Sequence, residues 1–287
     1  MTKRLEFIKM NGAGNDFVIF DARVENIVLS SDEIRRIASR SNEITKGCDQ
    51  LLVLEKSEKA DIFMRIYNAD GSEVSACGNA TRCVVQILAE EVGRLPVTME
   101  TRAVVLRGVS KEKSAEGKEF ILVDMGKPKF AWQDIPLAMP EAEAAQKIKE
   151  KYNLENPYFT HMGNPHVVFF WDSLENFPAE ELGKKIENNL EIFPERTNVS
   201  FAKLSVNGEV AQIEAIVWER GAGITKACGT AACAMLASAN RKNPNIKSAI
   251  IRFAKSGESV ETRFSEAGSI LLGGAIEKEF CGEVSVS

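Results

Sequence analysis

A short pattern occurs twice in this 287-residue chain, and this repeat constrains the fold more than any other feature of the sequence. Gly14–Phe20 reads GNDFVIF, and Gly163–Phe169 reads GNPHVVF. In the same way, Ala76–Ala80 reads ACGNA, and Ala227–Ala231 reads ACGTA. Both matches come in the same order at nearly the same separation of about 150 residues, which indicates a duplicated unit. We therefore expect two similar domains.

The segments around each Cys-Gly pair predict the same local structure in both halves. A β-type run, Ile62–Tyr67 in one half and Ile213–Trp218 in the other, is followed by a glycine-containing loop and then the Cys-Gly pair. Helical stretches follow at Gly78–Val92 and Thr230–Ala239, and both are too apolar to lie on a surface. The sequence thus predicts two α/β (α+β) units, each a curved, mostly antiparallel sheet or barrel around a central apolar helix.

Further elements follow from residue spacing and from turn residues. Ser31–Ser41, which Ser30 or Ser31 can cap, and Glu180–Asn188 have helical spacing. Strands are predicted at Phe17–Asp21, Leu51–Leu54, Val97–Thr101, Phe120–Val123, Val167–Trp171, Asn198–Ser205, Ala211–Val217, Ser248–Phe253, Ser259–Phe264 and Ser269–Leu272. A domain boundary is expected near Gly126–Pro128, whereas the pattern leaves open which unit holds the last strand.

Composition and charge exclude several classes of protein. Apolar residues make up 44% and charged residues 27% of the chain, which is ordinary globular composition. The net charge of −5, without blocks of like charge, gives no reason to expect a nucleic acid or an anionic membrane as partner. No signal peptide is visible, and runs such as Val167–Trp171 are too short to cross a bilayer. We expect a soluble, cytoplasmic protein.

Cysteine and histidine usage narrows the chemistry. The six cysteines are Cys48, Cys77, Cys83, Cys228, Cys233 and Cys281. None forms a C-x₂-C pair, and His161 and His166 are the chain's only histidines, so no metal site is expected and a Ser-His-Asp triad is disfavoured. Acid–base chemistry is therefore expected from Cys, Asp, Glu or Lys.

Cys77 and Cys228 stand out because each begins a buried helix and is followed by glycine. A helix N-terminus lowers the pKa of a thiol and can bind an anion, and the glycine lets a ligand approach the backbone. Two such thiols on opposite sides of one carbon could remove a proton and return it on the other face, which is racemisation or epimerisation without a cofactor. We interpret Cys48, Cys83, Cys233 and Cys281 as packing residues.

Seven motifs in order resemble the diaminopimelate epimerases, which are pyridoxal-phosphate-independent amino-acid epimerases. The motifs are Lys9–Phe17 (KMNGAGNDF), Gly47–Leu51 (GCDQL), Asn68–Glu73 (NADGSE), Ala76–Cys83 (ACGNATRC), Gly163–His166 (GNPH), Arg196–Val199 (RTNV) and Trp218–Ala231 (WERGAGITKACGTA). The resemblance implies interconversion of LL- and meso-2,6-diaminopimelate in lysine and peptidoglycan-precursor biosynthesis, with no cofactor.

The resemblance also implies a fold. It predicts two pseudo-symmetric domains that meet at a cleft holding the active site, with the last strand returning to the first domain. We assign residues 1–127 and 275–287 to the N-terminal epimerase domain and residues 128–274 to the C-terminal one. The implied partner is the small-molecule substrate, without nucleic acid or membrane; a homodimer is one candidate, and the oligomeric state is left open.

Carried over position by position, the resemblance assigns the site residues. Cys77 and Cys228 match the catalytic thiols, and His166 matches a supporting histidine near them. The substrate-binding positions are Asn15, Gln50, Asn68, Gly78, Asn79, Asn164, Asn198, Glu219, Arg220, Gly229 and Thr230, where Gly78, Asn79, Gly229 and Thr230 act through backbone amides. The departures from the family pattern, at Asn11, Cys48, Ala80 and Ala231, leave the catalytic pair intact.

The chemistry of the substrate fits these assignments. Only one amino-acid end is inverted, so the distal end must be held, and a buried Arg220 could grip its carboxylate with a bidentate fork. Glu219 could meet an ammonium group, and the asparagines offer donors and acceptors. The helix ends and His166 are expected to stabilise the thiolate. Asp16 and Asp70 are interpreted as loop or turn residues.

Other functions remain open at this point. A proline or hydroxyproline epimerase would keep both thiols but lack the grip on a distal carboxylate. From other classes, the chain could be a non-catalytic amino-acid-binding protein or a redox-sensing thiol protein. Substrate range separates the first alternative, and deuterium exchange from solvent into substrate separates the others.

Overall fold

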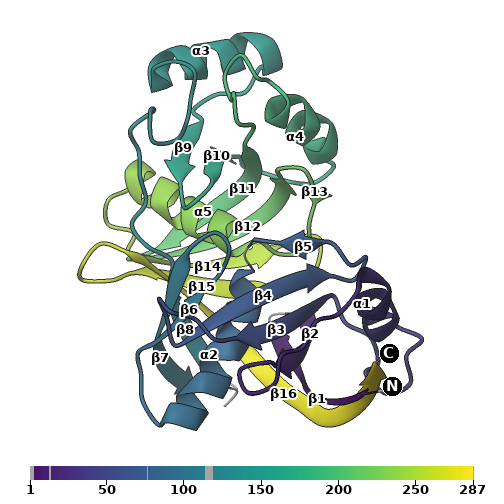
Figure 1. Ribbon diagram of the computed structural model, residues 1–287. Coiled ribbons are helices and arrows are strands. Elements are labelled where there is room, and N and C mark those ends of the chain that lie inside the picture. The colour runs from purple at the N-terminus through teal and green to yellow at the C-terminus, as the bar shows by residue number, and fades with distance from the viewer. Residues whose placement is uncertain (1–2, 13, 76, 114–118, 287) are drawn as a thin grey trace. The chain divides into compact units, whose positions relative to one another are not determined.

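A computed structural model describes residues 3–12, 14–75, 77–113 and 119–286 (Figure 1). The chain divides into two compact units: Met1–Asp124 with Gly273–Ser287, and Met125–Leu272. Each unit combines a curved sheet with one central helix, which confirms the predicted α+β class. None of the helices in these described segments is long and apolar enough to cross a bilayer.

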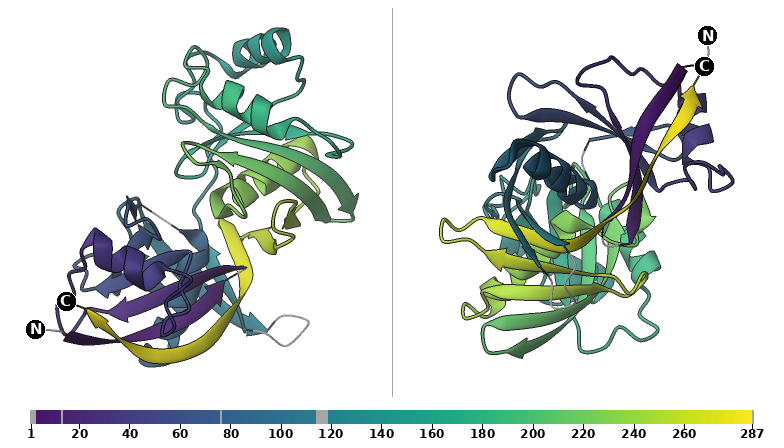
Figure 2. Two further views of the ribbon diagram at one scale, coloured as in Figure 1. Left: turned by 90° about the vertical axis from the view of Figure 1, so that its right-hand side faces the viewer. Right: turned by 90° about the horizontal axis from the view of Figure 1, so that it is seen from below.

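Unit 1 is a closed barrel of eight strands. Its strands are β1 (Lys3–Gly12), β2 (Asn15–Asp21), β3 (Gln50–Glu55), β4 (Ile62–Asn68), β6 (Val97–Glu100), β7 (Val105–Lys113), β8 (Glu119–Asp124) and the greater part of β16 (Ile270–Val286). They pair in that order, and β16 closes the ring by pairing antiparallel with β1. The two ends of the described chain lie side by side on this last pair (Figure 2).

Two helices and a short hairpin strand complete unit 1. Helix α2 (Gly78–Val92) packs against β1, β2, β6, β7 and β8, and most of its residues are buried. Helix α1 (Ser31–Ala38) covers another face and begins with a capping box between Ser30 and Glu33. Strand β5 (Glu73–Val74) pairs with β4 and leads toward α2.

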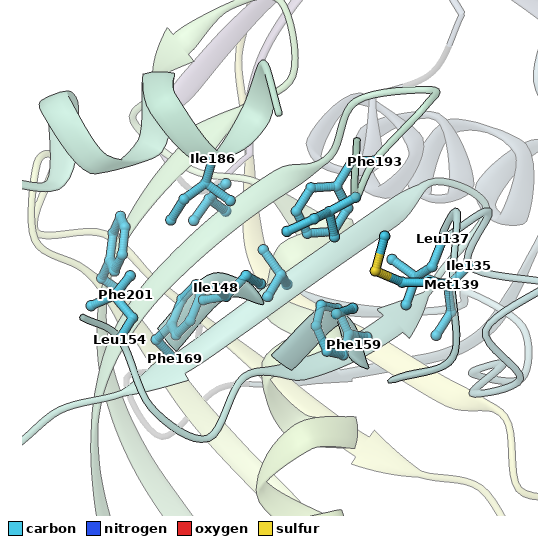
Figure 3. Packing of buried hydrophobic residues seen from close by; sticks show 14 of the residues in the cluster. Ile135, Leu137, Met139, Ile148, Leu154, Phe159, Phe169, Ile186, Phe193 and Phe201 are labelled. Carbon is cyan, nitrogen blue, oxygen red and sulfur yellow. The ribbon is translucent and has the colours of Figure 1, made fainter. Parts of the chain in front are cut away.

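Unit 2 is an open sheet with helices on both sides. Its elements are α3 (Glu141–Tyr152), β9 (Tyr158–His161), β10 (Pro165–Phe170), α4 (Ala179–Glu187), β11 (Asn198–Asn207), β12 (Val210–Glu219), β13 (Gly223–Ile224), α5 (Gly229–Lys242), β14 (Ser248–Phe253), β15 (Ser259–Phe264) and the start of β16. Helix α5 packs against β9, β10, β11, β12, β14 and β15. A separate aromatic core lies with α3 and α4, where Ile148 and Ile186 meet Phe169 and Phe201 (Figure 3).

The two units repeat the same topology, which confirms the predicted duplication. In unit 1, β2 and β3 are parallel, β3 and β4 antiparallel, and β4 and β6 parallel across α2. In unit 2, β10–β11, β11–β12 and β12–β14 follow the same scheme across α5. Phe17 lies opposite Gln50, and His166 lies opposite Asn198. Gln50 and Asn198 therefore hold equivalent places in the two sheets.

The structure corrects some local predictions. The first helix ends at Ala38 and not at Ser41, because Ser39 has an extended backbone. Strands β1, β7 and β9 and helix α3 were not predicted. Cys83 and Cys233 are fully buried, but Cys281 is exposed on β16, so the packing interpretation of Cys281 was wrong.

Candidate active site

In unit 1, Cys77 is the N-cap of α2 and has an extended backbone. Its sulfur accepts a hydrogen bond of 3.5 Å from the backbone N–H of Ala80. Gly78 and Asn79 are the first two helical residues, whose N–H groups have no acceptor within their own helix. Together with the positive end of the helix dipole, these groups could bind an anion beside the sulfur.

Three amide side chains lie at one end of the unit 1 strands. Asn15 begins β2, Gln50 begins β3, and Asn68 ends β4. Gln50 lies opposite Asn68, and its Nε2 donates to Asn68 Oδ1 over 3.1 Å. Asn15 pairs with Gly12, where an added Cβ would lie 3.0 Å from the carbonyl oxygen of Asn79. The register therefore brings the amides to the first turn of α2.

Two oxygens of these amides accept no hydrogen bond from the described residues. Asn15 Oδ1 and Gln50 Oε1 are buried and have no hydrogen-bond partner within the described part of the chain. A buried acceptor without a donor is costly, so a ligand N–H group directed at these oxygens would be favoured. An ammonium group fits this need.

In unit 2, Cys228 caps α5 at the equivalent place but meets a different environment. The cysteine is buried, and its sulfur lies 3.5 Å from Thr230 Oγ1. The carboxylate of Glu219, the last residue of β12, lies close enough to act on the thiol through its charge. Burial first, and then the charge of Glu219, raises the pKa of Cys228 well above its ordinary value.

This result corrects the expectation that both helix ends lower the thiol pKa. At Cys228 the loss of water outweighs the favourable helix end, because a thiolate would be buried next to a carboxylate. Burial likewise raises the pKa of Glu219, although the neighbouring Thr225 and Cys228 side chains act in the opposite direction. Cys228 is accordingly a protonated thiol in this structure.

His166 is fully buried in β10. Its Nε2 lies 2.8 Å from Asn164 Oδ1, and its Nδ1 has no partner among the described residues. Burial, reinforced by the nearby positive charges of His161 and Arg220, lowers the pKa of His166 to about 3. His166 is therefore neutral near pH 7 and supplies no positive charge, contrary to the expectation that it stabilises a thiolate.

Asn198 and Arg220 are linked through the backbone. Asn198 Nδ2 donates to the carbonyl of Pro165 over 2.8 Å, and its Oδ1 accepts from the backbone N–H of Arg220 over 3.0 Å. The side chain of Arg220 is exposed, and its Nη1 donates to the carbonyl of Glu195. The expectation of a buried Arg220 was wrong, because the residue lies in the turn just beyond the end of β12.

Glu187 is a site-supporting residue that sequence reasoning missed. Its buried carboxylate accepts from Trp218 Nε1 over 2.6 Å and from the backbone N–H of Gly221 over 2.7 Å. It thereby ties α4 to the turn that follows Glu219. The signal was present in the sequence, because Glu187 stands four residues after Gly183 on the buried face of α4.

These features define what each half-site can bind. Each offers a thiol, helix-end N–H donors for a carboxylate, and side-chain amides or a carboxylate for an amine. No group of three or more His, Cys, Asp or Glu side chains suited to a metal ion occurs among the residues that the structure describes.

Comparisons with known proteins identify the family of this chain. The family model described as "Diaminopimelate epimerase" matches residues 7–131 and 158–277. Curated diaminopimelate epimerases from Acidiphilium cryptum and Sphingopyxis alaskensis are both 41% identical to this chain. The first match covers 98% of this chain and 96% of the relative, and the second covers 96% of each.

Solved structures share the fold at low identity. A phenazine biosynthesis protein of the PhzF family from Bacillus anthracis aligns with a TM-score of 0.66 at 20% identity, over 99% of this chain and 100% of its own. A hydroxyproline epimerase from Agrobacterium vitis aligns with a TM-score of 0.60 at 12% identity, over 99% of this chain and 93% of its own. These likenesses concern the fold alone.

Proposed function

The chain belongs to the diaminopimelate epimerase family, and on that premise we propose that it interconverts LL- and meso-2,6-diaminopimelate by two-base proton transfer at the α-carbon. The observation that carries the proposal is the pair of cysteines, Cys77 and Cys228, that cap equivalent helices in two units of the same topology. The chemistry requires both sulfurs to reach one carbon, each from its own face.

The two half-sites support different starting protonation states. Cys77 receives an N–H donor from Ala80, which favours a thiolate, whereas burial and Glu219 keep Cys228 protonated. Cys77 then removes the α-proton and becomes a thiol, and Cys228 donates its proton to the opposite face and becomes a thiolate. The reaction inverts one carbon and leaves Cys77 as the thiol and Cys228 as the thiolate. The reverse reaction therefore starts with Cys228 as the base and Cys77 as the acid.

The negative charge that develops needs stabilisation from the protein. The N–H groups of Gly78, Asn79, Gly229 and Thr230 would hold the carboxylate at the reacting carbon, where the charge spreads as the proton leaves. The neutral His166 positions Asn164 through its Nε2. No cofactor is part of this proposal.

The protein would recognise the substrate by the amino-acid group at its distal end. The unpartnered oxygens of Asn15 and Gln50 would accept from an ammonium group. Asn68, Asn164 and Asn198 add donors and acceptors, and Arg220 would turn from the carbonyl of Glu195 to the distal carboxylate. The main role of Glu219 would be to keep Cys228 protonated through its negative charge. Its second role would be to bind an ammonium group of the substrate.

Proton NMR of LL-diaminopimelate in D₂O without added cofactor tests the proposal. The wild-type protein should replace the α-proton at the inverted carbon with deuterium from the solvent and form the meso isomer. Cys77→Ser and Cys228→Ser should each abolish inversion while the fold is kept, because a serine hydroxyl is far less acidic than a thiol. Near-wild-type turnover in either variant would refute the two-base reading.

The same assay distinguishes the other functions. Inversion of proline or hydroxyproline in place of diaminopimelate would favour that class of epimerase. Binding without deuterium exchange would indicate a non-catalytic binding protein or a redox thiol protein. We further propose a cytoplasmic location, since Cys48, Cys77, Cys83, Cys228, Cys233 and Cys281 are all free thiols. A homodimer is the proposed oligomer, which light scattering can check.

A further inference from the structure

Four charged side chains lie behind the strand ends that carry Asn15 and Gln50. They are Lys9, Asp16, Arg40 and Asp49, here called the charged brace. Successive residues of a strand face opposite sides of the sheet. Val18 and Leu51 belong to the core cluster beneath α1. Asp16 and Asp49 share that face by alternation, so Asn15 and Gln50 face the α2 side.

The two aspartates of the charged brace tie the two parallel strands together. The backbone N–H of Asp16 donates to Asp49 Oδ2 over 3.3 Å. In return, the backbone N–H of Asp49 donates to Asp16 Oδ1 and to the carbonyl of Asp16, each over 3.0 Å. These reciprocal bonds lie one residue before Phe17 and Gln50, where the regular ladder of β2 and β3 starts.

Two cations hold the aspartates in this arrangement. Lys9 is fully buried, and its Nζ donates to Asp16 Oδ2 over 2.5 Å and also to the carbonyl of Gly47. Arg40 donates to both oxygens of Asp16, over 2.5 and 2.8 Å, and to Asp49 Oδ1 over 2.9 Å. Although burial opposes it, the hydrogen bonds from Arg40 and Lys9 hold the pKa of Asp16 well below its usual range.

A buried ion pair is a poor way to gain stability. Taking a lysine and a carboxylate out of water costs free energy that their attraction often only offsets, and apolar side chains of similar volume can replace such a pair without loss. By contrast, Lys3 of the same strand β1 forms a surface ion pair with Glu25 at 2.7 Å. Stability alone therefore does not explain why the charged brace is present. Its position directly behind the unpartnered oxygens of Asn15 and Gln50 suggests a role in placing these two side chains.

We propose that Lys9, Asp16, Arg40 and Asp49 are positioning residues for substrate binding. By fixing the first residues of β2 and β3 against each other, they set Asn15 Oδ1 and Gln50 Oε1 at the spacing that an ammonium group of the substrate requires. Neither brace cation touches the substrate in this proposal. The inference rests on the proposed function and deepens it, since it concerns how the same site is built.

A double variant separates positioning from stability. Lys9→Met leaves Asp16 with only Arg40 as cation, and should raise KM at least about tenfold with a smaller change in kcat, because small displacements of binding groups are costly. Lys9→Met combined with Asp16→Leu replaces the buried pair by apolar side chains. We expect this double variant to regain most of the lost thermal stability but to keep the raised KM.

Lys3→Met is the matched control on the same strand, and it should leave KM, kcat and the melting temperature unchanged. Arg40→Met provides a second route, because Arg40 is half exposed and its loss leaves the core intact; it should raise KM several-fold. If the double variant regains both stability and wild-type KM, or if folded Lys9→Met and Arg40→Met keep wild-type KM, the inference is overturned. A wild-type protein that fails to invert diaminopimelate would instead overturn the proposed function.

Discussion

Acidification should destabilise unit 2 through His166. The native imidazole has a pKa of about 3, whereas an unfolded histidine titrates near the ordinary value of 6.5. The unfolded chain therefore takes up a proton that the native chain refuses. Stability from this group is fully present above the unfolded pKa and is lost as the pH falls toward 3.

The size of the effect follows from these two values. Between about pH 7 and about pH 4.5, the linkage relation gives a loss of about 2.5 kcal/mol in the free energy of unfolding. His166→Gln lacks this loss, because a glutamine amide can donate to Asn164 Oδ1 without titrating. Other groups, including Glu219 with its raised pKa, are common to both proteins and cancel in the difference.

Urea unfolding followed by tryptophan fluorescence measures this difference. Trp132, Trp171 and Trp218, the only tryptophans of the chain, all lie in unit 2 with His166. His161→Gln is the matched control and should keep most of the pH dependence, since His161 is only half buried. A difference between wild type and His166→Gln that does not vary with pH, or an imidazole signal of His166 titrating near its ordinary pKa, would refute the reasoning.

Three further predictions concern the site. Glu219→Gln should lower the pKa of Cys228, because a negative charge leaves the thiol's surroundings, and the pH profile of alkylation by iodoacetamide would show it; an unmoved profile contradicts the Glu219 contact. Arg220→Met should raise KM and lower kcat/KM by a factor that corresponds to about 2–4 kcal/mol, because the distal carboxylate of the substrate would lose its charged partner. Unchanged steady-state kinetics would place Arg220 outside the site. Mild oxidation should inactivate the protein through a Cys77–Cys228 disulfide, reversibly by dithiothreitol and with protection by substrate; peptide mapping that finds the modification on Cys48 instead would contradict it.

Local pattern was enough to identify the helices at the centre of both units. The stretch from Gly78 to Val92 is apolar on most faces, and such a helix can only be buried, so its bounds and its central place could be read directly. The repeated Cys-Gly starts likewise predicted that Cys77 and Cys228 cap equivalent helices. These features depend on residues close in sequence, which is why the chain alone determined them.

Strand β1 shows where local pattern fails. It carries Lys9 among residues that read as a polar, charged segment, and nothing nearby indicates that this lysine is buried. Its partners Asp16 and Gly47 come from other segments that meet it only in the folded barrel. Asp16 was accordingly taken for a loop residue and proved to be the centre of an ion network.

The sequence by itself determined the duplicated fold and the two cysteines at helix N-termini. Only the tertiary structure decided the protonation states and the exposure of the site residues. Cys228 stays protonated because it is buried next to Glu219, His166 stays neutral, and the side chain of Arg220 is exposed to solvent. The physical reason is that burial and charge act through space. A pKa depends on the water removed and on the charges brought near by distant segments, and neither is encoded in the spacing of residues along the chain.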